Sequence, residues 1–404
     1  MPRLTPLFHA IPFVVATALL AGCFRGTDPT GPGAGGAPTL RAYVSTGSSD
    51  EVAVIDTVLR RPATDPIKVP GFPSRMVVAP PATANEKSRE LLFVLCRNTS
   101  GSVAFVNRRS NNVEATVQAG INPTDLAVTS DGAYVYVVSP EERRLRRIDV
   151  ESRQVDREET LPEDFEPVSV AVRNFRQAAP DARGRYPHAV LVLSRKPVLT
   201  TTGASASVKV ARMAVFNVAG TNVARTGQLL DVGLGRDPQQ PSRVMVWEDA
   251  AGTSAFAHVV DFSNGQWMSV RDLSAWQPGN LPVQQETVVI LSATGGVGGI
   301  ALDSNGWQYL SYPAEGGIMA IQPRGQSGNL TRFSPVGSFV PTALAVNGDN
   351  SELWAVSPGR GKVVAWDLVP TGGLGANSGS VLFSLLAGAA PVPEDVVLAP
   401  GIGR

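Results

Sequence analysis

A short sequence unit returns along most of this chain at a nearly constant spacing. In five places an aromatic residue or a histidine lies 13 residues before a polar residue, and in a sixth the separation is 14. These pairs are Tyr43 and Asp56, Phe93 and Asn107, Tyr136 and Asp149, His258 and Arg271, Tyr309 and Gln322, and Trp354 and Asp367. Each pair encloses two apolar runs around a polar turn, which is typical of a β-hairpin. The chain is therefore expected to be built from repeated hairpins.

A second repeated element lies between these hairpins. It is a proline followed three and five residues later by apolar residues, and it begins at Pro73, Pro123, Pro167, Pro241, Pro341 and Pro393, with a copy lacking the proline at Val297. The copies are 44 to 74 residues apart, within the range expected for propeller blades. Each repeat supplies four short strands, which are stable only when neighbouring blades cover both faces.

The two ends of the repeat region predict how the ring closes. The first repeat has no proline strand of its own, and the last proline strand, which begins at Pro393, has no hairpin after it. Joining them makes one composite blade and seven blades in all. We therefore predict an all-β, seven-bladed β-propeller over residues 40–404, closed by pairing of the N- and C-terminal strands, so that no sheet edge is left to aggregate.

The motifs are similar to those of the YVTN β-propeller repeat family. The similarity rests on Tyr43-Val44, on VAVID at residues 52–56, and on a Pro-x-x-apolar-Ala-Val strand ended by Asp131-Gly132. It covers roughly residues 40–400 and is weakest in the fourth copy, which has an insertion at 195–207, and in the fifth, which has a long turn at 273–283. Some propellers that resemble this family are lactonases, but a shared fold alone does not establish activity.

The N-terminus predicts an export signal. Arg3 precedes an apolar run at residues 7–20 that is too short to be a spanning helix, and the run ends in LAGC, with Cys23 last. This sequence resembles the lipobox of bacterial lipoproteins, in which Cys23 would be the lipidated residue. The alternative is an ordinary secretory signal with a chance cysteine.

The lipobox resemblance divides the chain into three parts. We predict a lipoprotein signal peptide at 1–22, a lipidated cysteine with a Gly/Pro-rich tether at 23–39, and the propeller at 40–404. The residue after the cysteine is Phe24 rather than aspartate, which implies the outer membrane of a Gram-negative bacterium. The expected address is therefore the cell envelope, with the membrane contacted through an N-terminal lipid.

Composition excludes several classes of function. Lys+Arg and Asp+Glu are both 35, so no overall field favours nucleic acid as a partner. Once the signal is removed, the only histidines are His188 and His258, and Cys96 lies inside an apolar run. There is no Cys-x-x-Cys-His, HExxH or EF-hand sequence. We expect no metal site and no cofactor.

Candidate site residues lie at one position of the repeat. Four charged residues, each two positions after a motif proline, should meet at the mouth of the channel: Arg75, Asp125, Arg243 and Asp395. They form either a mutually neutralising cluster or a binding site, and Arg75 is expected to keep the two carboxylates ionised. The fourth blade adds Arg195, Arg236 and Asp237 on long loops, which often carry function.

Three classes of function fit these observations. The first is a lipid-anchored binding or scaffold protein of the cell envelope, with an envelope protein or glycan as partner. The second is a lactonase-like or other hydrolase that uses carboxylates at the channel mouth. The third is a subunit of an envelope assembly complex. Neither histidine is expected at the channel mouth, and nucleophilic catalysis needs such a base, so binding is favoured over covalent chemistry.

Overall fold

The structure is a computed structural model that describes residues 40–79, 88, 90–98, 100–202, 206–219, 222–232, 241–262, 267–283, 286–291, 296–314, 317–321, 331–333, 340–358, 361–368, 380–384 and 393–400. These residues belong to one unit of the chain, Pro38–Arg404, and form strands β1 to β30. Within these ranges no helix is long and apolar enough to cross a membrane. The predicted signal peptide, Cys23 and the tether lie outside the described residues.

The strands form seven antiparallel sheets, numbered here as blades in chain order. Blade 1 contains β1 (Leu40–Thr46), β2 (Glu51–Asp56), β3 (Arg61–Pro62), β4 (Ile67–Lys68) and β30 (Pro393–Pro400). Blade 2 contains β5 (Phe72–Val78), β6 (Leu91–Arg97), β7 (Ser102–Asn107) and β8 (Asn112–Gln118). Blade 3 contains β9 (Asp125–Val128), β10 (Tyr134–Ser139), β11 (Arg144–Asp149) and β12 (Gln154–Thr160).

The remaining blades are numbered in the same way. Blade 4 contains β13 (Pro167–Asn174), β14 (His188–Ser194), β15 (Val198–Thr202), β16 (Ala206–Ala219) and β17 (Asn222–Val232). Blade 5 contains β18 (Pro241–Glu248), β19 (Ala255–Asp261), β20 (Trp267–Asp272) and β21 (Glu286–Ile290). Blade 6 contains β22 (Gly299–Leu302), β23 (Gln308–Tyr312), β24 (Gly317–Ile321) and β25 (Thr331–Phe333). Blade 7 contains β26 (Ala343–Val346), β27 (Glu352–Ser357), β28 (Lys362–Asp367) and β29 (Ser380–Ser384).

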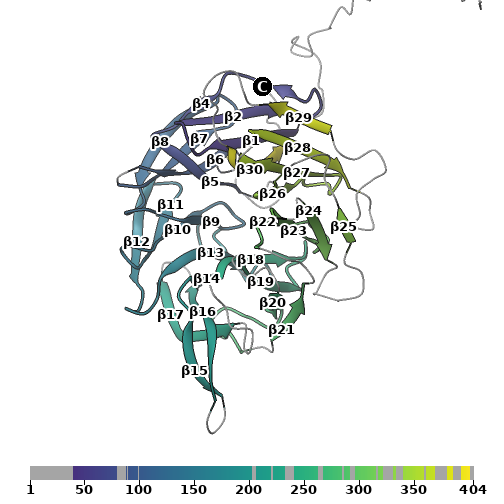
Figure 1. The fold of residues 1–404 in the computed structure, drawn as a ribbon. Helices are drawn as coiled ribbons and strands as arrows, with labels where there is room; N and C mark the ends of the chain where they lie inside the picture. The colour runs from purple at the N-terminus through teal and green to yellow at the C-terminus, as the bar shows by residue number, and fades with distance from the viewer. Residues whose placement is uncertain are drawn as a thin grey trace, which may run out of the picture. The chain divides into compact units, whose positions relative to one another are not determined.

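The seven motif strands are the innermost strands of the seven blades, as predicted. They are β5, β9, β13, β18, β22, β26 and β30, and each lies at one end of its sheet order. Figure 1 shows them gathered around the centre of the ring, with the later strands of each sheet farther out. The fold is therefore a seven-bladed β-propeller.

Ring closure by the two ends of the described chain is also confirmed. Strand β30 pairs antiparallel with β1, with Val396 opposite Val44 and Ala399 opposite Arg41. The inner strand of blade 1 thus comes from the C-terminal end of the repeat region, and its hairpin comes from the N-terminal end. Blade 1 is therefore complete only when both segments are present.

The hydrophobic core is divided among the interfaces between blades. In the described part of the chain, seven clusters of buried side chains occur, one between each pair of neighbouring blades. The cluster that joins blades 7 and 1 packs Ala42, Val44 and Val396 against Trp354 and Val356. Burial on both faces explains why the inner strands lack a clean alternation of apolar and polar residues.

The polar residues that end the second hairpin strand mostly serve the following turn. Asp56 accepts the backbone N–H groups of the second and third residues after it at 2.9 and 2.8 Å. Asn107 and Asp149 bind the following turns in a similar way. Asn217 differs, because β16 continues to Ala219 and leaves the Asn217 Oδ1 atom buried without a hydrogen-bond partner among the described residues.

The insertion in the fourth repeat forms an extra hairpin. Strand β15 pairs with the first part of β16, from Val198 opposite Val210 to Thr202 opposite Ala206. The rest of β16 pairs with β14 on one side and β17 on the other. In Figure 1 this hairpin projects outward from the ring. The extra hairpin follows β14 in the chain. The last residue of β14 pairs with the first residue of the inner strand β13. Because the candidate site residues stand near the first residue of each inner strand, the hairpin begins on the face of the channel mouth.

Candidate functional site at the channel mouth

The four predicted charged residues meet as two ion pairs. Arg75 Nη1 lies 3.4 Å from Asp395 Oδ1, and Arg243 Nη1 lies 3.0 Å from Asp125 Oδ1. Arg75 and Asp395 come from neighbouring blades, whereas Arg243 reaches past blade 4 to Asp125 on blade 3. Arg75, which was expected to act on both carboxylates, forms its ion pair with Asp395, and its interaction with Asp125 is an electrostatic one without a contact.

A serine that sequence reasoning missed connects this second pair. Ser169 Oγ donates a hydrogen bond to Asp125 Oδ2 at 2.6 Å and accepts the Val244 N–H at 3.1 Å. Asp125 Oδ2 also accepts the Val170 N–H at 3.0 Å. Ser169 stands two residues after Pro167, so the motif spacing identified its position. A serine carries no charge, so the sequence alone does not distinguish it from the other serines of the chain.

The carboxylate of Asp395 makes an equivalent connection between blades 1 and 2. Its Oδ2 accepts the backbone N–H of Met76 at 2.9 Å, and its own N–H donates to Ser45 Oγ at 2.9 Å. Met76, Val170 and Val244 all stand three residues after a motif proline. In three places, therefore, a polar side chain on one inner strand binds the same backbone position on the next inner strand.

We call the five residues that stand two positions after the motif prolines of blades 1 to 5 the polar arc: Asp395, Arg75, Asp125, Ser169 and Arg243. The equivalent positions in blades 6 and 7 are Gly299 and Ala343, which we call the apolar arc. A Cβ atom on Gly299 would lie 2.6 Å from the carbonyl oxygen of Thr342, so the backbones of blades 6 and 7 approach each other closely there. Strand contact replaces the side-chain connections of the polar arc at that point.

The arginines and the aspartates of the polar arc differ in exposure. The side chains of Asp125 and Asp395 are 2% and 10% exposed, whereas those of Arg243 and Arg75 are 21% and 25% exposed. Among the described residues each guanidinium has a single hydrogen-bond or ion-pair partner, whereas a guanidinium carries five N–H donors. The remaining donor capacity at the channel mouth belongs to the arginines.

The electrostatic environment of the pairs is set mainly by burial. Burial raises the pKa of Asp395 above its usual range, although Arg75 and Arg243 oppose this change. Arg75 thus acts on this carboxyl in the expected direction, by lowering its pKa, but burial has the larger effect. Burial also lowers the pKa of Arg243, and repulsion by Arg75 adds to that effect, so the two guanidiniums are close enough to repel each other.

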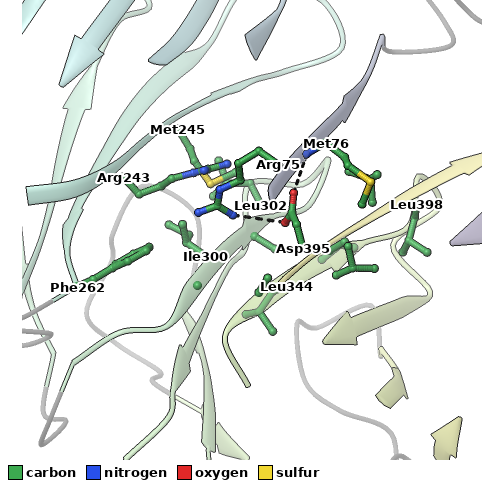
Figure 2. Close-up of a pocket in the computed structure, with 17 residues that line it drawn as sticks. Arg75, Met76, Arg243, Met245, Phe262, Ile300, Leu302, Leu344, Asp395 and Leu398 are labelled. Carbon is green, nitrogen blue, oxygen red and sulfur yellow. Dashed lines mark hydrogen bonds and ion pairs between the residues drawn. The ribbon is translucent and has the colours of Figure 1, made fainter. Parts of the chain in front are cut away.

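A cavity of about 210 Å³ opens beside these arginines. Figure 2 shows Arg75, Arg243 and Asp395 along one side of it. Met245, Phe262, Ile300, Leu302 and Leu344 also line the cavity, and we call these five residues the apolar wall. In Figure 2, Phe262, Ile300 and Leu344 lie below the two arginines, and Met245 lies beside Arg243. We call this space the channel-mouth cavity.

The other predicted site residues are not part of this cavity. Arg195 lies on the same face, where its side chain is 44% exposed and pairs with Glu166 at 3.3 Å. Lys196 borders a separate cavity of about 340 Å³ with Glu163 and Glu166. Arg236 and Asp237 lie outside the described residues.

The histidines and the described cysteine are packed inside the blades. His188 is buried on β14 and its Nε2 lies 2.7 Å from the hydroxyl of Tyr136, and burial lowers its pKa to about 4. Burial lowers the pKa of His258 to about 3. Cys96 is fully buried on β6, where burial raises its thiol pKa to about 12. In the residues that the structure describes, no group of three or more metal-ligating side chains occurs.

Comparisons with known proteins agree with the fold. Neither a protein-family model nor a curated protein matches the sequence. Among solved structures, a putative 6-phosphogluconolactonase from Bacteroides uniformis superposes with a TM-score of 0.60 at 14% identity, covering 90% of this chain and 100% of that chain. A functionally unknown protein from Desulfotomaculum acetoxidans gives a TM-score of 0.60 at 11% identity, covering 90% and 99%.

A third similar structure carries a different name. It is Kuenenia stuttgartiensis hydrazine synthase, with a TM-score of 0.57 at 13% identity, covering 81% of this chain and 92% of that chain. At these identities the likeness concerns the fold alone. The chain is thus a β-propeller with a polar and an apolar arc at its channel mouth, and its activity has to be argued from that site.

Proposed function

We propose that this chain is a lipid-anchored β-propeller of the bacterial cell envelope that binds an acidic group of a partner molecule at its channel mouth. The observation that carries the binding part is the division of hydrogen bonds within the polar arc. The carboxylates of Asp125 and Asp395 are occupied by backbone N–H groups, a serine and one arginine nitrogen each. The guanidiniums of Arg75 and Arg243 keep most of their donors for a ligand.

An anion between the two arginines would be favoured for electrostatic reasons. Burial is the main cause of the lowered pKa of Arg243, and repulsion by Arg75 adds to it. A bound carboxylate or phosphate would accept donors from both and would relieve that repulsion. Guanidinium groups match the geometry of these anions by forming paired hydrogen bonds. The partner we favour is an acidic group on an envelope protein or glycan.

Anion binding can be measured with two simple probes, acetate and inorganic phosphate. An anion present at 100 times its Kd stabilises a folded protein by about 2.7 kcal/mol. Thermal unfolding of the full chain at constant ionic strength should show a higher Tm in acetate or phosphate than in chloride. Arg243→Gln should remove this increment.

The matched control is Arg195→Gln, on the same face but outside the cavity, which should keep the increment. The readout is the difference between anions within one variant, so a lower basal Tm of Arg243→Gln does not affect it. Equal Tm values in all three anions for the unaltered chain would refute the proposal.

The envelope part of the proposal rests on the N-terminal sequence. The lipobox resemblance predicts a diacylglyceryl group on Cys23, and the YVTN resemblance of the repeats is compatible with an exported propeller. Intact mass spectrometry of the membrane fraction should show a chain that begins at acylated Cys23, and Cys23→Ser should move the protein to the soluble fraction. A soluble, unmodified native chain would refute the anchor without affecting the binding site.

A hydrolase of lactonase type is the second candidate function. It is favoured by the raised pKa of Asp395, since a carboxyl group that keeps its proton at higher pH can act as a general acid. Two solved neighbours from Bacteroides are named putative 6-phosphogluconolactonases. Hydrolysis of 6-phosphogluconolactone by the full chain, lost in Asp395→Asn but not in Arg195→Gln, would support this function over binding alone.

A further inference from the structure

The channel-mouth cavity has two walls of opposite chemistry. Arg75, Arg243 and Asp395 form the charged part of its lining, and the apolar wall forms a hydrocarbon surface that begins beside Arg243, at Met245, and includes Phe262, Ile300 and Leu344 (Figure 2). The division follows the repeat, because the inner strands of blades 6 and 7 place glycine and alanine where the blades of the polar arc place charged residues or serine. A ligand that fills the cavity therefore contacts both kinds of surface.

The apolar wall is only partly covered by protein. Phe262, Met245 and Leu302 are half-buried, whereas Ile300 and Leu344 are each 7% exposed. Removing such a surface from water stabilises a complex by about 25 cal/mol per Å² of apolar area. The wall thus offers binding free energy to a hydrocarbon group that a purely ionic ligand cannot use.

The volume of the cavity limits the size of that group. An engineered apolar cavity of about 150 Å³ holds a benzene molecule. The channel-mouth cavity, with about 210 Å³, has room for one ring or a short branched chain together with an acidic group. A larger sugar phosphate would extend out of it.

The charges on the polar side favour a ligand with a single negative charge. Two arginines and two aspartates balance each other there, so each added negative charge is repelled by Asp125 and Asp395 as well as attracted by the guanidiniums. A dianion such as a phosphate monoester doubles the attraction and the repulsion alike, so it gains no net charge interaction and costs more to remove from water. A carboxylate also matches the planar guanidinium donors.

We propose that the channel-mouth cavity binds a small apolar monocarboxylate, with its carboxylate on the two arginines and its hydrocarbon group on the apolar wall. This inference rests on the anion-binding function proposed above, but it assigns the cavity to a small molecule in place of an acidic group on an envelope protein or glycan. It requires both walls to act on one molecule, which can be tested separately from anion binding.

Isothermal titration of the full chain with benzoate, 4-methylpentanoate, acetate, inorganic phosphate and benzyl alcohol tests the proposal. Benzoate or 4-methylpentanoate should bind at least about tenfold more tightly than acetate, because only they contact the apolar wall. They should also bind more tightly than phosphate. Benzyl alcohol, which has the ring without the charge, should bind at least about tenfold more weakly than benzoate.

Substitutions in the apolar wall then locate the effect. Leu302→Asn should weaken benzoate more than acetate and so reduce the preference for benzoate to less than about threefold. The matched control Leu302→Met keeps an apolar side chain of similar volume and should keep the preference. If Leu302→Asn does not fold, Ala345→Leu, which fills the cavity from blade 7, should weaken benzoate and spare acetate.

The outcomes separate this inference from the proposed function. If acetate and phosphate bind as tightly as benzoate, or if Leu302→Asn keeps the preference, the monocarboxylate inference is wrong and the anion site stands. If none of the four anions binds, the proposed function itself is wrong.

Discussion

The polar and apolar arcs of the channel mouth occupy the same position of the repeat but join their blades by different means. In the polar arc, side chains of one inner strand bind the backbone of the next, as Asp125 and Ser169 do for Val170 and Val244. In the apolar arc, Gly299 allows direct approach of the backbone of blade 7. A single repeat position can therefore hold the ring together either with a hydrogen-bonding side chain or with the absence of a side chain.

This difference also explains why a cavity forms on one side of the channel. Gly299 and Ala343 line the cavity with little or no side chain, and Arg75 and Arg243 line it with long side chains. The same residues of the polar arc thus connect the blades and offer hydrogen-bond donors to a ligand. The following experiments test whether the two arcs differ in stability as well as in chemistry.

The largest effect is expected from removing β30, where the polar arc begins. A chain truncated before Pro393 loses the inner strand of blade 1, including buried Val396 and Ala399 and the Asp395 bond to Met76. Because stability in repeat folds is carried by the interfaces between repeats, we expect loss of the cooperative unfolding transition. Near-ultraviolet circular dichroism during heating measures it. A truncated chain with an unchanged transition would show that the strand does not close the ring.

The next largest effect is expected at the centre of the polar arc. Asp125→Ala leaves Arg243, Ser169 and the Val170 N–H without their shared partner, and breaking such a buried pair costs about 3–5 kcal/mol. Urea unfolding measures the change. The control is Asp164→Ala, an exposed carboxylate paired with Arg212, which should cost less than about 1 kcal/mol. Similar losses for both would mean that the polar arc does not connect the blades.

An intermediate effect should appear with pH at blade 5, where the polar arc ends. His258 lies on the same face of its strand as Phe256 and Val260, which pack between blades 5 and 6. Its buried Nδ1 atom has no hydrogen-bond partner among the described residues. Its folded pKa of about 3 lies below the usual value of 6.5, so the unfolded chain binds the proton more readily. Stability from this group is therefore lost as pH falls below 6.5, by about 1.4 kcal/mol per pH unit.

The variant His258→Phe tests this assignment. It should reduce the slope of unfolding free energy against pH between 4.5 and 6.5, which amounts to roughly 2 kcal/mol over the whole interval because the full slope is reached only below pH 6.5. His188, with a folded pKa of about 4, contributes a similar slope that should remain. An unchanged slope in His258→Phe would mean that His258 is accessible to protons in the folded state.

A smaller effect is expected in the apolar arc. In Gly299→Ala the new Cβ would lie 2.6 Å from the Thr342 oxygen and 3.0 Å from the Ala343 Cα, so blades 6 and 7 must separate slightly. Such overpacking costs about 1–3 kcal/mol. In the control Gly348→Ala the new Cβ meets no atom within 4 Å, and we expect little change in thermal stability. Equal behaviour of the two variants would contradict the proposed role of close backbone approach.

The smallest effect is expected for the serine of the polar arc. Ser169→Ala removes the acceptor of the Val244 N–H and one of the donors to Asp125, at a cost of about 1–2 kcal/mol. Ser169→Thr keeps the hydroxyl and should cost less. If alanine is tolerated as well as threonine in urea unfolding, the connection between blades 4 and 5 is made by packing alone.

The sequence by itself determined the class of fold and the location of the candidate site. Hairpin spacing and the proline strands predicted seven blades, and the incomplete first and last repeats predicted the pairing of β1 with β30. These features are local, because turns, strand periodicity and repeat length depend on residues that are close together in the sequence. The same spacing placed Arg75, Asp125, Arg243 and Asp395 at the channel mouth, because equivalent positions in a ring of repeats lie at equivalent depths.

Only the tertiary structure decided which of these residues contact one another. Arg243 reaches Asp125 across an intervening blade, and Ser169 joins them, whereas the sequence suggested Arg75 as the partner. The pKa of Asp395 rises because burial outweighs its neighbours, and burial depends on the whole ring rather than on adjacent residues. The cavity and its apolar wall likewise come from five strands that are distant in sequence. Contacts, desolvation and empty space are properties of packed neighbours, and a repeat pattern specifies where a side chain stands but not what faces it.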